Sequence, residues 1–304
     1  MLDPLPSGHR SGFIAVVGRP NVGKSTLINA FLGQKIAAVS PRPQTTRLQQ
    51  LGILTRPEVQ AVFIDTPGVH LPRHKLGEFM NRVAERALAD ADLLLFITDL
   101  SSWPEPDDRR LADLIRRRPG GASVFLALNK LDLVRPARLS ALLAEHQALA
   151  EGATPFAISA TRGDGREALL ETLLRALPQG PRYYAEEDVT DTYVRDLAGE
   201  LVREAALNAL REEVPHGIAV QVEEFKERPN GDTYVRATLF VERPSHKAIV
   251  IGRGGAMLKT IGQRARREIE ALTGSKVFLE ILVKVDEDWR DSAPALRRFG
   301  YQAR

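Results

Sequence analysis

Cysteine is absent from this chain of 304 residues, and histidine is scarce, with 6 residues that show no ligand spacing. The absence of cysteine excludes disulfides, thiolate metal sites, iron–sulfur clusters and a cysteine nucleophile. Long apolar runs are also missing, since the longest, Leu93 to Ile97, is far shorter than the roughly 20 residues that cross a bilayer. The first residues, MLDPLPSGHRSG, lack the apolar stretch of a secretory signal, so a soluble cytoplasmic protein is expected.

The charge of the chain is nearly balanced but unevenly distributed. The length suggests two domains, and the formal net charge is only +3. Residues 243–276 nevertheless carry eight basic and two acidic side chains, whereas residues 181–242 carry seven basic and fourteen acidic ones. This local excess of positive charge indicates a surface that binds a polyanion.

The first 177 residues alternate short apolar runs with amphipathic stretches. Such alternation is typical of an α/β fold, here a mostly parallel sheet with helices on both faces. We expect strands at 13–17, 59–64, 93–98, 124–128 and 154–158, with an additional edge strand at 49–55. We expect helices at 25–32, 74–90, 107–118, 136–151 and 165–177.

The pattern breaks at Pro178, Gly180 and Pro181, and an acidic stretch follows. We therefore predict a first domain at 1–180, a linker at 181–191 and a second domain at 192–304. The second domain has the order α-β-β-α-α-β, a compact α+β arrangement. Its expected elements are a helix at 192–213, strands at 218–225 and 234–241, helices at 245–251 and 257–272, and a strand at 277–285.

A phosphate-binding loop is predicted directly after the first strand. GRPNVGKS, residues 18–25, matches GxxxxGK[ST] and opens a helix, where backbone N–H groups and the helix N-terminus favour an anion. Lys24 would reach the β- and γ-phosphates, and the Ser25 hydroxyl would ligate Mg²⁺. The alternative is a glycine-rich turn without a ligand. The predicted nucleotide-binding residues are Gly18, Arg19, Pro20, Asn21, Val22, Gly23, Lys24, Ser25 and Thr26.

A second motif, Asp65-Thr66-Pro67-Gly68, follows the strand expected at 59–64. Asp65 can hold Mg²⁺ through water, and the Gly68 N–H can contact the γ-phosphate. Taken alone, this sequence indicates only a turn. Its distance from Lys24 and its place at a strand end favour a sensor of the γ-phosphate.

Two more motifs indicate which base is bound. Asn129-Lys130-Leu131-Asp132 follows the strand expected at 124–128. The Asp132 carboxylate can accept hydrogen bonds from guanine N1–H and N2–H₂, which adenine cannot offer, so this motif predicts GTP over ATP. Ser159-Ala160-Thr161 follows the last strand, where the Ala160 N–H can contact guanine O6.

In this order and spacing, the motifs resemble those of GTPases of the translation-factor class. Residues 43–47, PQTTR, are similar to the element in which a threonine completes the Mg²⁺ shell, and either Thr45 or Thr46 fits. The resemblance assigns hydrolysis to Lys24, Thr45, Thr46, Asp65 and Gly68.

Two residues of this chain bear on the mechanism of GTP hydrolysis. Val69 stands where Ras-like GTPases have a water-orienting glutamine, which implies slow unassisted hydrolysis that needs a cation, a partner or another side chain. Asn21 matches the asparagine that coordinates K⁺ in potassium-activated relatives. The alternative is that Asn21 only helps to form the turn of the phosphate-binding loop.

The second domain contains a GxxG loop, Gly252-Arg253-Gly254-Gly255, between two helical stretches, and it resembles a type II KH domain. Glycines there let the backbone approach a nucleic acid closely. Ile249, Ile251, Leu258 and Ile261 would form the floor of a groove for about four unpaired bases. The alternatives are a helix–helix turn with a solvated basic face and a dinucleotide-binding loop, which the missing strand before it argues against. The positive field would come from Arg253, Lys259, Arg264, Arg266 and Arg267.

A GTPase domain followed by a KH domain resembles the Era family of ribosome-associated GTPases over nearly the whole chain. The resemblance implies a monomer that hydrolyses GTP to GDP with Mg²⁺ and K⁺, binds the 3′ end of 16S ribosomal RNA and assists assembly of the 30S subunit. It also implies peripheral association with the inner membrane. An RNA chaperone with a structural nucleotide is the second hypothesis, and a small-molecule phosphotransferase is a third that the NKLD motif argues against.

Overall fold

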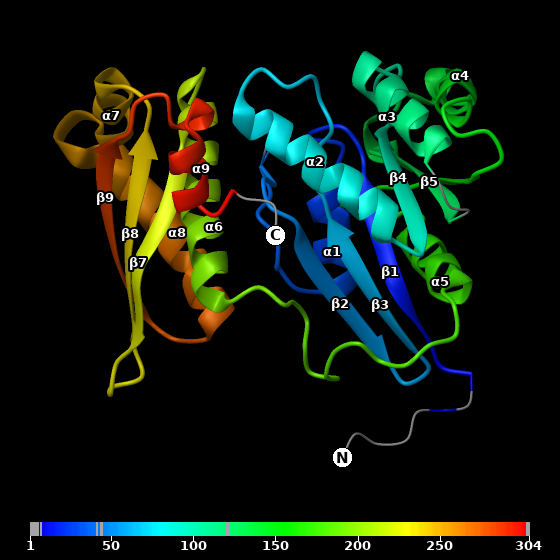
Figure 1. Cartoon of the computed structure of the whole chain (residues 1–304), viewed down its shortest axis with the longest axis horizontal. Coiled ribbons are helices and arrows are strands. Elements are labelled where there is room, and N and C mark those ends of the chain that lie inside the picture. The colour runs from blue at the N-terminus through cyan, green and yellow to red at the C-terminus, as the bar shows by residue number, and fades with distance from the viewer. Residues whose placement is uncertain (1–5, 7, 41, 43–44, 119–121, 302–304) are drawn as a thin grey trace. The chain divides into compact units, whose positions relative to one another are not determined.

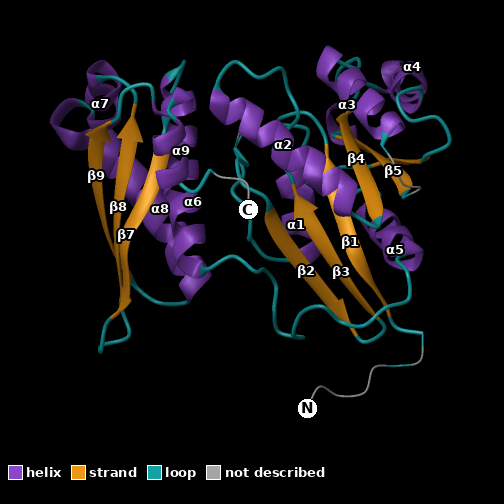
Figure 2. Cartoon of the chain, viewed as in Figure 1, coloured by secondary structure: helices purple, strands orange, loops and turns teal. Residues whose placement is uncertain are grey.

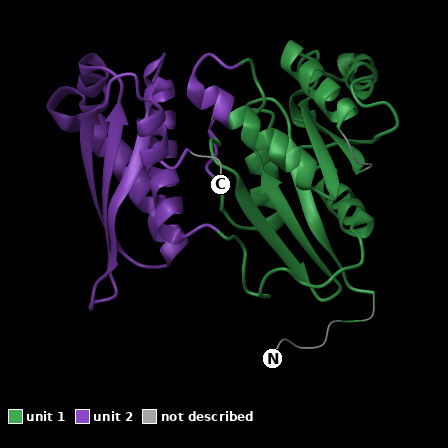
Figure 3. Cartoon of the chain, in the orientation of Figure 1, with its two compact units in different colours: residues 1–37, 46–71, 80–191 green, residues 38–45, 72–79, 192–304 purple. Residues whose placement is uncertain are grey.

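The computed structural model describes residues 6, 8–40, 42, 45–118 and 122–301. It divides into two compact units, which are described separately (Figure 3). The first unit comprises Met1–Ala37, Thr46–Leu71 and Met80–Asp191. The second comprises Thr192–Arg304 together with two short segments from the first half of the sequence, Ala38–Thr45 and Pro72–Phe79.

The first unit is built on a six-stranded sheet of order β2-β3-β1-β4-β5-β6, which confirms the predicted α/β fold (Figures 1 and 2). All neighbouring strands are parallel except β2, which pairs antiparallel with β3 at the edge, in agreement with the additional edge strand expected from the sequence. The strands are β1 (Arg10–Val17), β2 (Gln50–Arg56), β3 (Val59–Asp65), β4 (Leu93–Asp99), β5 (Ser123–Asn129) and β6 (Thr154–Ala157).

Helices cover both faces of this sheet because its strands are apolar on both sides. On one face, Ile14 and Val16 pack with side chains of α1 (Lys24–Leu32) and α5 (Arg166–Ala176). On the other, Ala15 and Val17 share a core with α2 (Lys75–Asp90), α3 (Pro106–Arg117) and α4 (Pro136–Gln147). Four of the predicted motifs, at residues 18–25, 65–68, 129–132 and 159–161, lie at the carboxyl ends of strands, the edge at which such sheets bind ligands.

The second unit has the predicted order α-β-β-α-α-β. Its sheet has the order β7-β8-β9, with β7 antiparallel and β9 parallel to β8. Val235, Ala237 and Leu239 form one core with apolar residues of the helices, among them Ile261 and Ala265. The elements are α6 (Val194–Ala209), β7 (Ala219–Glu227), β8 (Thr233–Val241), α7 (Pro244–Ile251), α8 (Ala256–Thr273) and β9 (Val277–Val285).

The structure departs from several of the predicted bounds: the strand expected at 13–17 begins at Arg10, and the helix expected at 136–151 ends at Gln147. The helix expected to reach residue 213 also ends early, at Ala209, and a short 3₁₀ turn follows at Val214–Gly217. A last helix, α9 (Ala293–Arg298), is not predicted by the sequence pattern, because six residues are too few to show helical periodicity. Its start is set by Ser292, whose side chain accepts a hydrogen bond from the Ala295 N–H, and by a proline in the first turn.

Candidate functional site

The phosphate-binding loop connects β1 to α1, as its sequence predicts. Lys24 lies in the first turn of α1 and is 6% exposed, and its Nζ donates to the carbonyl oxygens of Gly18 and Arg19, both at 3.0 Å. Burial lowers the pKa of Lys24 to about 8, while the Asp65 carboxylate acts in the opposite direction. A phosphate bound beside this ammonium would favour its charged form and raise the pKa again.

The shape of the loop depends on close contacts that exclude side chains. A Cβ on Gly18 would lie 2.5 Å from the Ile97 carbonyl oxygen, and one on Gly68 would lie 2.6 Å from the Pro20 nitrogen. The second contact brings the DTPG turn directly against the phosphate-binding loop. Asn21 adopts the left-handed conformation, with φ of 65°, which asparagine tolerates better than most residues.

Three side-chain oxygens from separate motifs converge beside Lys24. Ser25 Oγ donates to Asp65 Oδ2 at 2.6 Å, Thr46 Oγ1 donates to the same oxygen at 3.1 Å, and the two hydroxyls lie 2.9 Å apart. Asp65 is fully buried, and its other oxygen, Oδ1, has no hydrogen-bond partner among the described residues. Burial raises the pKa of this carboxyl, against the hydrogen bond from Ser25 and the charge of Lys24.

This oxygen cluster fits a magnesium ion. Mg²⁺ prefers oxygen ligands and is usually held by one or two protein groups together with phosphates and waters. A buried, unpartnered carboxylate oxygen beside two hydroxyls is such a donor set. Thr45 does not share in it, because its hydroxyl donates to the Arg42 carbonyl at 2.8 Å. Of the remaining residues of the PQTTR segment, Pro43 and Gln44 lie outside the described residues.

The residues around the DTPG turn are buried. Thr66 donates from its hydroxyl to the Val16 carbonyl at 2.8 Å, which fixes the end of β3 to β1. Val69 is 2% exposed and belongs to the core on the α2 side of the sheet. The position that would orient water in Ras-like GTPases therefore presents no hydrogen-bonding side chain here.

The base-recognition motifs are joined by Asn129. Its Nδ2 donates to the Val22 carbonyl at 2.7 Å, and its Oδ1 accepts from the Ala160 N–H at 2.9 Å. One amide thus ties the phosphate-binding loop to the loop after β6. The Ala160 N–H therefore already donates a hydrogen bond within the protein. Its contact with guanine O6 stays a prediction, and it requires this N–H to be shared between Asn129 Oδ1 and the base.

The Asp132 carboxylate is held by the Ser159 hydroxyl, which donates to its Oδ1 at 2.6 Å. Ser159 Oγ also lies 3.2 Å from Thr161 Oγ1, so the SAT motif supports the NKLD motif directly. Lys130 has a φ of 67°, which is unusual for a residue with a long side chain, and its Nζ donates to Asp99 Oδ2 at 2.6 Å.

Asp99, at the end of β4, is a residue that the sequence analysis missed. It pairs with Arg19 at 3.6 Å as well as with Lys130, and Arg19 also pairs with Glu105 at 3.1 Å and Asp108 at 3.2 Å. Although burial raises the pKa of Asp99, hydrogen bonds from Lys130 and Ser101 and the charge of Lys130 hold it below its ordinary value. Through these ion pairs, the Arg19 side chain connects the phosphate-binding loop to the start of α3.

The GxxG loop of the second unit connects α7 to α8. Gly252, Gly254 and Gly255 all have positive φ, at 71°, 58° and 79°. A Cβ on Gly252 would lie 2.9 Å from the Met257 nitrogen, so glycine is required there. Arg253, between these glycines, is exposed.

A groove of about 450 Å³ lies between α8 and β9. Its lining includes the predicted residues Gly255, Leu258, Lys259 and Arg266. Ile261 is fully buried in the core, so the prediction that it lines a groove is wrong. Ile249, Ile251, Arg264 and Arg267 are not among the residues that line it. The sequence analysis did not foresee the remaining lining residues, Gly262, Gln263, Val277, Phe278, Leu279 and Ile281.

The first unit has the fold and the motif geometry of a P-loop GTPase, and the second has the fold and GxxG loop of a KH domain. The family described as "50S ribosome-binding GTPase" matches residues 13–130, and the family described as "KH domain" matches residues 213–290. GTPase Era of Heliobacterium modesticaldum is 42% identical over 294 residues, which cover 96% of this chain and 97% of that protein. The chain therefore belongs to the Era family of GTPases, as the resemblance predicted.

Two solved structures of this family match nearly the whole chain. Era in complex with MgGDPNP and nucleotides 1506–1542 of 16S ribosomal RNA is 38% identical, with a TM-score of 0.89, and the match covers 97% of this chain and 100% of that one. A single-residue variant of Aquifex aeolicus Era bound to GDP·AlF₄⁻ is 37% identical, with a TM-score of 0.88 and the same coverage. No helix within the part of this chain that the structure describes is long and apolar enough to span a membrane.

Proposed function

We propose that this protein is a GTP-hydrolysing switch that binds the 3′ end of 16S ribosomal RNA through its KH unit and assists assembly of the 30S subunit. The observation that carries the proposal is the match over nearly the whole chain to a relative solved with both MgGDPNP and that RNA. The oxygen cluster in the first unit and the groove in the second supply sites of suitable chemistry. A cytoplasmic location, peripheral membrane association and a monomeric state stay predictions from the family resemblance.

The nucleotide site acts mainly by positioning and by electrostatic complementarity. Lys24 binds the β- and γ-phosphates, and Ser25, Thr46 and Asp65 hold Mg²⁺, which when bound neutralises charge on the phosphates. Asp132 accepts from the guanine edge, and Ser159 keeps its carboxylate in place. Because Val69 offers no hydrogen bond, the attacking water must be oriented by another group.

Thr46, rather than Thr45, is the threonine that we assign to Mg²⁺, since only its hydroxyl lies beside Ser25 and Asp65. We expect Thr46→Ala to lower the rate of GTP hydrolysis by about tenfold or more, because a metal ligand is lost. Thr45→Ala, its matched control, should change the rate by less than about threefold. The Mg²⁺ dependence of both variants at saturating GTP measures this, and a larger loss in Thr45→Ala would reverse the assignment.

A monovalent cation is the second part of the proposal. Asn21 lies in the phosphate-binding loop and is placed by sequence to hold K⁺ near the charge that develops on the phosphates. Hydrolysis should therefore be faster in K⁺ than in Na⁺ at equal ionic strength, and Asn21→Ala should remove the difference. Equal rates of the unmodified protein in the two salts would leave Asn21 as a turn residue.

The switch itself is tested by the coupling between the two ligands. RNA affinity, measured with a fluorescent fragment of the 16S 3′ end, should differ between the GTP-analogue and GDP forms. Reciprocity then requires the RNA to change the ratio of the GTP-analogue and GDP affinities by the same factor. Equal RNA affinities would instead support an RNA chaperone in which the nucleotide is a structural ligand, a function consistent with the buried Val69.

A further inference from the structure

An arginine and two aromatic rings form a cluster at the start of β8 and β9. Tyr234 and Phe278 are opposite each other in the register of these strands, with ring centroids 5.9 Å apart and planes at 24°. The guanidinium carbon of Arg228 lies 5.0 Å from the Tyr234 ring and 5.3 Å from the Phe278 ring. Phe278 is 58% exposed, which is unusual for a phenylalanine held in a stack.

The cluster is fixed by its surroundings. Arg228 belongs to the turn between β7 and β8, where its N–H donates to the Asp232 carbonyl at 2.8 Å and its carbonyl accepts from the Gly231 N–H at 2.9 Å. The Tyr234 hydroxyl donates to Glu280 Oε2 at 2.7 Å. Among the described residues no carboxylate forms an ion pair with Arg228, so its charge is directed to the rings and to solvent.

The groove of the KH unit reaches the edge strand β9 beside this cluster. Val277, Leu279 and Ile281 pack on the α8 side of the sheet, whereas Phe278 alternates with them and lies on the other side, at the edge. Phe278 is one of its lining residues, and so are Gly255 at the GxxG loop and Arg266 further along α8. Ile281 lies opposite Gly262, whose Cβ would be 3.8 Å from its Cδ1, whereas the Val277 N–H donates to Glu270 near the end of α8. Moving along the groove from the GxxG loop therefore means moving along β9 toward Phe278.

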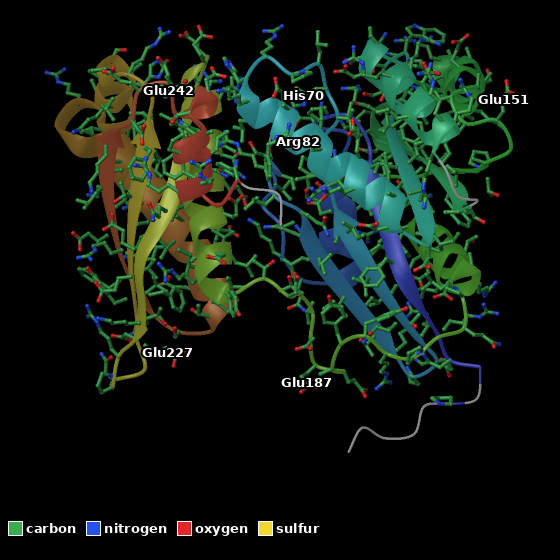
Figure 4. The ribbon with its side chains drawn as sticks, viewed as in Figure 1. His70, Arg82, Glu151, Glu187, Glu227 and Glu242 are labelled. Carbon is green, nitrogen blue, oxygen red and sulfur yellow. The ribbon has the colours of Figure 1, made fainter. Side chains whose placement is uncertain are left out.

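Figures 1 and 4 agree with this course of the groove along the sheet. α7 lies at one end of the three-stranded sheet, and the β7–β8 turn lies at the other (Figure 1). Glu227, the residue before Arg228, is labelled at that turn (Figure 4). From Gly255 to Arg266 the helix rises about 16 Å, so the aromatic cluster lies at the end of the groove that is remote from the GxxG loop.

We infer that Phe278 is a stacking site for the base that leaves the groove at this end and passes the edge of β9, with Arg228 beside it to contact the adjoining phosphate. The inference rests on the proposed RNA binding and extends it. A KH groove holds about four nucleotides, so a further unpaired base needs its own surface. An exposed aromatic ring next to an arginine provides one for any base, because every base has a π-face. This site lengthens the bound strand without adding sequence discrimination.

The test compares RNA oligomers of two lengths on the full chain. The probes are a tetranucleotide from the 16S 3′ end and two hexanucleotides that extend it by two residues at the 5′ or the 3′ end. Phe278→Ala should weaken one of the hexanucleotides by about tenfold or more, the size of a lost base stack, and leave the tetranucleotide within about twofold. Phe278→Trp, which keeps a stacking face, should retain the hexanucleotide affinity.

The matched control is Leu282→Ala. Leu282 is on β9, four residues after Phe278 on the same face of the strand, is 40% exposed and takes part in none of these ring contacts. It should leave all three affinities unchanged. Equal affinities of Phe278→Ala and the unmodified protein for both hexanucleotides, or an equal loss for the tetranucleotide, would overturn the stacking site. Failure of the unmodified protein to bind any of the oligomers would instead overturn the proposed RNA binding itself.

Discussion

An Asp132→Asn variant is expected to bind guanine nucleotides more than tenfold more weakly and to bind xanthine nucleotides better than the unmodified protein does. Guanine presents two donors, N1–H and N2–H₂, to the carboxylate, whereas xanthine presents a carbonyl in place of the amino group. The Ser159 hydroxyl donates to Asp132 Oδ1 at 2.6 Å, so the asparagine would keep its oxygen toward Ser159. Its amide nitrogen would then face the base, where it repels guanine and donates to xanthine.

Titration with fluorescent GDP and xanthosine diphosphate analogues measures both changes. The matched control is Asp164→Asn, which removes the same charge from a side chain in the loop after β6. This control should keep its preference for guanine. Undiminished GTP affinity in Asp132→Asn would remove Asp132 from its role in base recognition. An equal loss in the two variants would show that the effect comes from the charge of the loops rather than from the base edge.

The arrangement of the first unit was largely predictable from its sequence. Buried parallel strands are continuous apolar runs, so residues 93–98 and 59–64 identify β4 and β3 to within a residue. The motifs at residues 18–25, 65–68, 129–132 and 159–161 were predictable because each lies at the carboxyl end of a strand, whereas PQTTR was assigned only through its resemblance. The Arg19–Asp99–Lys130 network was not predictable, since residues 19, 99 and 130 come together only when the strand order places β4 between β1 and β5.

The choice between Thr45 and Thr46 shows a similar limit. Two adjacent residues in a loop with no periodicity present no sequence signal that orients one hydroxyl rather than the other. The structure separates them through their partners, because Thr46 reaches Asp65 and Thr45 reaches the Arg42 carbonyl.

In the KH unit, the sequence predicted the loop but only part of the groove. Ile261, Ala265 and Ile269 are spaced four residues apart and are all fully buried, so this spacing marks the core side of α8. Ile261 was assigned to the groove because it is apolar and close to the GxxG loop. The opposite wall, formed by β9, required the knowledge that this strand lies at the edge of the sheet, next to β8.

A double variant of the GxxG loop, Arg253→Asp with Gly254→Asp, should lose affinity for single-stranded 16S RNA by about tenfold or more. Arg253 is exposed, and its reversal removes a cation where phosphates must approach. Gly254 has a φ of 58°, a conformation that aspartate adopts more readily than most residues, and a Cβ there meets nothing within 4 Å. The substitutions therefore place two carboxylates in the path of the RNA backbone without crowding the fold.

The slope of log K against log salt distinguishes a lost phosphate contact from a general loss of binding, since each contact to a single strand contributes about 0.7 to it. The matched control is Arg297→Asp with Gly300→Asp, which makes the same change of charge at an exposed arginine and at a glycine with a φ of 81° and open space around it. Guanine-nucleotide affinity, measured in parallel, reports whether the first unit is folded in each variant. If the loop variant kept full RNA affinity, the KH groove would not be the RNA site. If loop and control variants lost affinity equally, the loss would come from the net charge of the unit, because only the loop variant changes the surface at the end of the groove.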